Sequence, residues 1–145
     1  MFHDCSSLTA LNVSGFDTGK GQNFKNMFAG CKSLTALDVS GFDTGAASNM
    51  SYMFEDCESL TELDVSGFSA GRVNWCAGML RGCSSLTGLS LAAFNGANVQ
   101  TAAQMFEGCS ALETLDLSGF DTRNVTSCCE IIPPDLSRLD WPESE

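Results

Sequence analysis

The sequence predicts an α/β solenoid, a stack of coils with a parallel sheet of five short strands on one face and short helices on the other. Three observations favour this fold class. The 145-residue chain repeats itself at a constant step of 26 residues. Each repeat has one stretch with the apolar spacing of a helix, and then one with the spacing of a strand. A fixed period of this length means that each unit buries its apolar face against its neighbours.

The 26-residue step appears as columns of identical residues that run through five repeats without an insertion. The columns are Met1, Met27, Met53, Met79 and Met105; Cys5, Cys31, Cys57, Cys83 and Cys109; Leu8, Leu34, Leu60, Leu86 and Leu112; Leu11, Leu37, Leu63, Leu89 and Leu115; and Phe16, Phe42, Phe68, Phe94 and Phe120. Since coils of such a stack share one continuous core, we expect residues 1–132 to form one domain with half-units at both ends.

A short helix is predicted in the stretch "SNMSYMFEDC", residues 48–57. Its apolar residues Met50, Met53, Phe54 and Cys57 stand at i, i+3, i+4 and i+7, the spacing of one helix face. Ser48 is placed to cap the first turn. The equivalent stretches of the other repeats carry the same expectation.

A short strand is predicted after each helix. In "LTELDVSGF", residues 60–68, Leu60, Leu63 and Val65 follow the pattern LxxLxL, and Leu63 and Val65 alternate around Asp64 as inward residues of a strand do. Strands that recur in the same direction with a helix between them pair in parallel through right-handed crossovers. Five strands of one sheet are therefore expected.

The repeats end near Pro133. Ile131 and Ile132 still occupy the Met and Phe columns, but two prolines follow them and forbid a helix. Residues 133–145 are a tail that can fold back over the last coil. Its apolar residues Leu136, Leu139 and Trp141 would then act as a cap.

The repeat resembles a known family. LxxLxL on a period of 20 to 29 residues is the leucine-rich repeat pattern. The phrases "MFEDCESLTELDVSGFSAGRVNW" (residues 53–75) and "LDLSGFDTRNVTSC" (residues 115–128) resemble the BspA-like leucine-rich repeat surface proteins of bacteria. They are also similar to a related repeat family of mycoplasma proteins of unknown function. The resemblance implies a right-handed leucine-rich repeat at the cell surface or secreted, which attaches to host proteins, matrix proteins or other cells. Phenylalanine replaces the asparagine of the general pattern, so we expect stacked rings inside the turn.

Charge and motifs exclude several functions. The net charge is −11 with only seven Lys and Arg, so nucleic acid and anionic membranes would be repelled. No run of about 18 apolar residues predicts a membrane span. The single histidine, His3, lacks the partners of a catalytic dyad, and no phosphate-binding glycine motif occurs. We expect a monomeric protein that is not an enzyme and has no cofactor.

The eight cysteines are interpreted mainly as core residues. The five repeating thiols lie one per coil on the face predicted to be buried, where a free thiol behaves as a small hydrophobe. Cys76 and Cys128 share a column with Phe24 and Met50 and are also expected in the core. Cys129 shares its column with small or polar residues, which predicts a surface position.

The candidate binding site is the outward face of the predicted strands. Its acidic residues fall in stacked rows: Asp38, Asp64, Asp116, Glu62 and Glu113. Two carboxylates side by side repel each other, so their pKa values are expected to rise. A protein ligand, or alternatively a glycan, would bind there according to the resemblance.

Other readings of the same face stay open. It can be a solvated surface, with the chain acting as a passive spacer. Asp38 and Asp64 can also share a calcium ion as part of a calcium-assisted binding array, although two carboxylates supply fewer than the six to eight oxygens that calcium takes.

Overall fold

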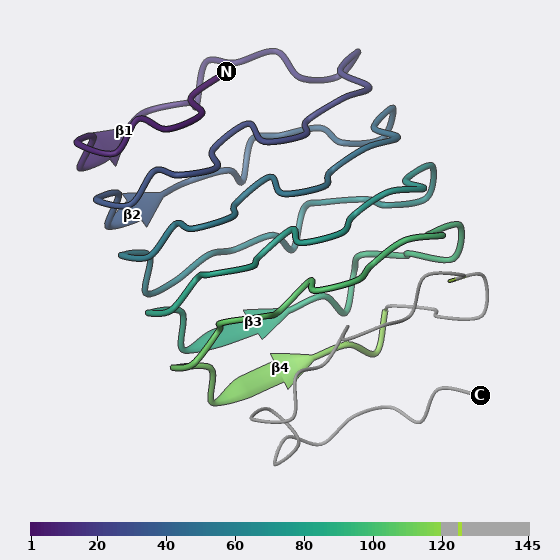
Figure 1. Cartoon of the computed structure of the whole chain (residues 1–145). Coiled ribbons are helices and arrows are strands. Elements are labelled where there is room, and N and C mark those ends of the chain that lie inside the picture. The colour runs from purple at the N-terminus through teal and green to yellow at the C-terminus, as the bar shows by residue number, and fades with distance from the viewer. Residues whose placement is uncertain (120–124, 126–145) are drawn as a thin grey trace.

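The computed structural model describes residues 1–119 and 125. We call each 26-residue stretch a coil: coil 1 is 1–26, coil 2 is 27–52, coil 3 is 53–78, coil 4 is 79–104 and coil 5 is 105–119. Successive coils lie side by side along the molecule (Figure 1). The described residues contain four strands, β1 (Ala10–Leu11), β2 (Ala36–Leu37), β3 (Gly88–Ser90) and β4 (Thr114–Asp116).

The strands form two separate two-stranded parallel sheets, β1 with β2 and β3 with β4. Ala10 pairs with Ala36 and Gly88 pairs with Thr114, so partners are equivalent residues of adjacent coils. On another side of the coils, isolated parallel bridges join Asn23 to Asn49, Asn49 to Trp75, and Trp75 to Thr101. Backbone pairing therefore holds neighbouring coils in register at two places.

The predicted α/β solenoid, with its five-stranded sheet and layer of helices, is wrong. The described residues contain no helix, and coil 3 has no strand between β2 and β3. Residues 51–56, in the predicted helix, are turns. Their N–H groups do not follow the helical ladder: the N–H of Tyr52 donates to Ala77 O at 2.9 Å, and that of Phe54 to Met79 O at 2.9 Å. Every second N–H thus bonds to the next coil.

Backbone conformation explains why these segments do not continue as helices. Two columns have positive φ in coil after coil, which a right-handed helix excludes. One column stands directly before each repeating cysteine: Asp4, Gly30, Asp56, Gly82 and Gly108, with φ between 57° and 79°. The other comprises Asn26, Tyr52, Gly78 and Gln104, with φ between 58° and 61°. Each coil therefore turns sharply inside the stretch where the helix was expected.

The core lies inside the coils and is built from the repeating apolar columns. Phenylalanine rings stack from coil to coil: Phe28 and Phe54 have centroids 5.6 Å apart, and Phe42 and Phe68 lie 6.4 Å apart with ring planes inclined by 3°. The expected stacking of rings in the Phe16 column is confirmed for that second pair. Offset ring pairs add specific stabilisation beyond the area that they bury.

Six cysteines fall within the described residues, and all six are free. Five of them are buried, as predicted, and Cys5 is half-buried: the buried ones are Cys31, Cys57, Cys76, Cys83 and Cys109. Repeating thiols donate to the previous coil, for example Cys57 Sγ to Phe28 O at 3.3 Å. Burial raises the pKa of Cys57 and of Cys76 to about 12. The predictions for Cys128, Cys129, the Pro133 boundary and the tail lie outside the described residues.

Within the described part of the chain, no helix is long and apolar enough to span a membrane.

Candidate functional site

The row that holds Asp38, Asp64 and Asp116 is organised by a local turn. Each carboxylate Oδ1 accepts the backbone N–H of the serine two residues later at 2.9 Å: Ser40 for Asp38, Ser66 for Asp64 and Ser118 for Asp116. This is an Asx turn, in which the side chain imitates a backbone turn. The aspartates are therefore fixed at the point where the chain leaves the strand face.

Uncharged residues make the same turn in two coils. Asn12 Oδ1 accepts the N–H of Ser14 at 3.0 Å in coil 1. Ser90 Oγ accepts the N–H of Ala92 at 3.3 Å in coil 4. The turn therefore requires a side-chain oxygen at this position and does not require a negative charge.

The expected rise in the pKa of the aspartates is wrong. The pKa of Asp38 and of Asp64 lies below the ordinary value of 3.8 because the side chain and the N–H of the following serine donate to the carboxylate. For Asp116 the N–H of Ser118 is the larger cause and its hydroxyl the smaller. Repulsion from Asp38 raises the pKa of Asp64, but it is the smallest effect there. The row is therefore ionised at neutral pH.

The five predicted residues are all exposed, but only two of them line one groove. Asp64 and Asp116 belong to it, whereas Asp38, Glu62 and Glu113 lie outside its lining. Within the described residues none of the five takes part in an ion pair. Lys32 and Arg81 instead pair with other glutamates, at 3.6 Å to Glu58 and 3.4 Å to Glu55.

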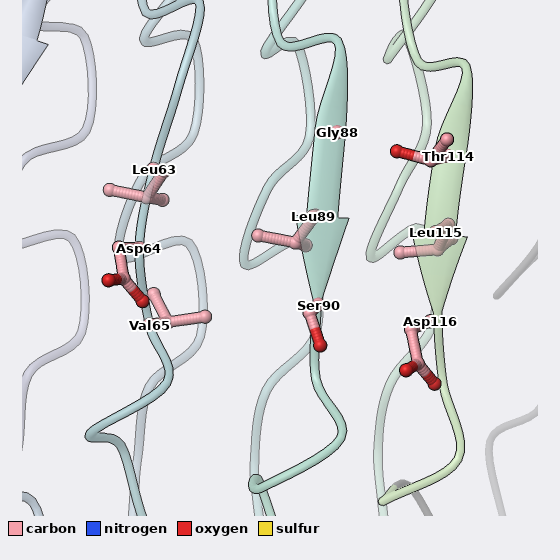
Figure 2. A pocket seen from close by; sticks show the side chains of 9 residues that line it. All are labelled: Leu63, Asp64, Val65, Gly88, Leu89, Ser90, Thr114, Leu115 and Asp116. Carbon is pink, nitrogen blue, oxygen red and sulfur yellow. The ribbon is translucent and has the colours of Figure 1, made fainter.

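The groove crosses three coils over β3 and β4, and its volume is about 440 Å³ (Figure 2). Figure 2 shows Leu63, Leu89 and Leu115 in one row and Asp64, Ser90 and Asp116 in the next. Val65, Gly88 and Thr114 complete the lining. The three leucines are 6–8% exposed, whereas Leu60, Leu86 and Leu112 are at most 1% exposed. The groove therefore combines an apolar floor with an acidic margin.

Gly88, Ser90 and Thr114 also lie on this outward face, but they were not among the predicted site residues. Gly88 stands in a column with Ala10, Ala36 and Glu62, so it is the one member of that column without a side chain. Ser90 interrupts the aspartate row. Both departures were visible in the sequence, but only adjacent coils in register show that they fall at one place.

A second surface feature was also missed. Trp75 is 45% exposed and occupies the row of isolated bridges on another side of the coils.

Arg81 forms ion pairs with two glutamates. It lies between Glu55 and Glu107, with Arg81 Nε 3.6 Å from Glu107 Oε1. Arg81 therefore pairs with glutamates of both neighbouring coils, whereas Glu107 Oε2 is buried without a hydrogen-bond partner among the described residues.

Among the described residues, no three His, Cys, Asp or Glu side chains are grouped to hold a metal ion.

Together these features define a repeat protein whose coils share one acidic face. A family model described as "Mycoplasma protein of unknown function, DUF285" matches residues 1–88 and, again, residues 62–133. The chain belongs to this family. No curated protein matches it, and no solved structure does.

Proposed function

We propose that this chain is a non-catalytic adhesion or protein-interaction module that binds a basic partner through its acidic strand face. The observation that carries the proposal is the row of ionised aspartates, held in place by their turns and unpaired with any cation of the described residues. Aligned fixed charges steer an oppositely charged partner and set its register. The net charge of −11 favours the same kind of partner.

The identity of the partner rests on the resemblance to BspA-like surface proteins. It supports a protein of the host, of the matrix or of another cell, and a location at the cell surface or outside the cell. A glycan is the other ligand class that suits an exposed face of hydroxyls and carboxylates. The module would act as a monomer.

One observation favours a second function, that of a passive spacer. Each aspartate already has a structural task, because it accepts the N–H that closes its turn. In that case the charges would only keep the face solvated.

Binding to immobilised, purified extracellular-matrix proteins separates the two functions. The face variant carries Asp38→Asn, Asp64→Asn and Asp116→Asn, and Asn12 shows that asparagine keeps the turn. Its control carries Asp17→Asn, Asp43→Asn and Glu58→Gln, which also removes three charges. Asp17 and Asp43 accept turn N–H groups at 3.3 and 2.9 Å outside the aspartate row.

The two functions predict different results in this assay. An interaction module should lose affinity and salt dependence in the face variant and keep both in the control, because charge steering fades with ionic strength. A passive spacer should bind none of the matrix proteins, or bind them equally well in both variants.

A further inference from the structure

The acidic face has a gap at Gly88. In the column Ala10, Ala36, Glu62, Gly88 and Thr114, Gly88 lacks a side chain, and a Cβ built there would lie 2.7 Å from Thr114 Oγ1. The hydroxyl of Thr114 therefore occupies the edge of the space that a side chain at position 88 would fill. Because Gly88 has no side chain, the groove is open at this point toward the leucines that line it, Leu63, Leu89 and Leu115.

The same coil interrupts the charged row. Ser90 stands between Asp64 and Asp116, and all three line the groove. β3 pairs with β4, so Asp116 is the register partner of Ser90 on the adjacent strand, about 4.8 Å away, and Asp64 holds the equivalent place in coil 3 on the other side of Ser90. Each carboxylate accepts one hydrogen bond from a serine N–H at 2.9 Å. An ionised carboxylate has about four acceptor sites. Both can accept further hydrogen bonds.

The floor and the margin together match one kind of side chain. Arginine carries an aliphatic stem that packs on apolar surface and a cationic head that stays at the polar edge. Its planar guanidinium donates in several directions, so it can serve two carboxylates on opposite sides. A neutral or acidic side chain would leave both aspartates uncompensated.

We propose that this groove is a subsite for one arginine side chain of a partner protein, with the stem over Leu89 and Gly88 and the guanidinium over Ser90, between Asp64 and Asp116. The inference rests on the proposed function, since it names the chemistry that the acidic face recognises. Gly88 is then a specificity-determining residue, because any larger residue would fill the place of the stem.

The probe for the test is Nα-acetyl-arginine amide, followed by amide NMR shifts of the ¹⁵N-labelled protein. Nα-acetyl-citrulline amide has nearly the same shape without the charge and serves as the control ligand. We expect saturable shifts at Gly88, Ser90 and Thr114 with the arginine probe and none with citrulline. Equal shifts with both ligands, or arginine shifts spread over the whole acidic row, would overturn the subsite.

Variants sharpen the assignment. Asp64→Asn with Asp116→Asn should weaken binding of the probe roughly fivefold or more, because the guanidinium loses its attraction to both carboxylates. Asp17→Asn with Asp43→Asn removes the same amount of charge outside the groove and should change the affinity for the probe less than twofold. Gly88→Ala should also weaken binding of the probe several-fold while the Tm falls only slightly, since alanine occurs at positions 10 and 36 and the Thr114 hydroxyl can rotate away from the new Cβ. Unchanged binding in Gly88→Ala would overturn the placement of the stem.

The proposed function and the subsite can fail separately. Matrix-protein binding can fall in the three-aspartate face variant while the arginine probe leaves the amide signals of the groove unchanged. Binding through the acidic face is then supported, and the arginine subsite is overturned. If the probe shifts the groove as described and no matrix protein binds, the subsite stands and the adhesion function fails.

Discussion

At the scale of single residues, the aspartate row has two tasks that substitution can separate. Asparagine keeps the turn acceptor and removes the charge, as Asn12 does in coil 1, whereas alanine removes both. We expect Asp64→Ala to lower the Tm at pH 7 more than Asp64→Asn does. The measurement is thermal unfolding of both variants in the same buffer. Equal loss in the two variants would mean that the charge, and not the turn, stabilises this position.

The lowered pKa values also set a pH dependence. A carboxyl whose pKa is lower in the folded than in the unfolded state stabilises the fold above the unfolded pKa, and this contribution is lost as pH falls through the folded pKa. Since the pKa of Asp38, Asp64 and Asp116 lies below 3.8, the window is below about pH 4. Wild type should therefore lose more stability than the triple Asn variant between pH 5 and pH 3. Urea titrations at the two pH values measure the free energy of unfolding. An equal loss in the wild type and in the triple Asn variant would contradict this prediction.

The burial of the cysteines predicts how they react with thiol reagents. Only the thiolate reacts with a disulfide reagent, and burial raises the pKa of Cys57 and Cys76 to about 12. At pH 8 we expect the five buried cysteines to react only when the protein unfolds, and all eight to react in denaturant without reductant. Native reaction of more than three thiols would contradict their burial, and fewer than eight in denaturant would reveal disulfides.

At the scale of the element, the turn before each cysteine decides the path of the coil. Gly82 has φ of 79°, and a Cβ there would collide with the side chain of Asp56 in the previous coil. Left-handed backbone costs a residue with a Cβ about 1–2 kcal/mol, so Gly82→Ala should destabilise the protein by at least that much. Gly67→Ala is the control, since the nearest atom to its Cβ is Ser40 O at 3.6 Å. Urea unfolding of both variants measures the difference, and similar losses would show that the turn tolerates a side chain.

At the scale of the whole molecule, stability depends on the position of a residue along the stack. Phe28 is fully buried between Phe2 and Phe54, with ring centroids 5.7 and 5.6 Å away. Phe28→Ala should cost about 3–5 kcal/mol of unfolding free energy, as large-to-small core changes do. Phe2→Ala should cost clearly less, because Phe2 is only partly buried in the first coil. Equal costs in denaturant titrations would show that the first coil is as well covered as the second.

The sequence alone determined what is buried and what repeats. The step of 26 residues, the apolar columns, the buried thiols and the stacked phenylalanines follow from composition and spacing, because burial selects residues by size and polarity. The acidic row could be located in the same way, since its members alternate with buried leucine and valine.

Only the tertiary structure decided where the backbone hydrogen bonds go. Apolar spacing of i, i+3, i+4 and i+7 suits a helix, but it suits equally a series of tight turns that point the same residues inward. The choice depends on whether the N–H of a residue such as Phe54 bonds within its own segment or to Met79 in the next coil. The Gly or Asp before each cysteine was the local signal of the turns. The groove likewise exists only between coils, because Gly88 and Ser90 come together with Asp64 and Asp116 through the register of neighbouring backbones.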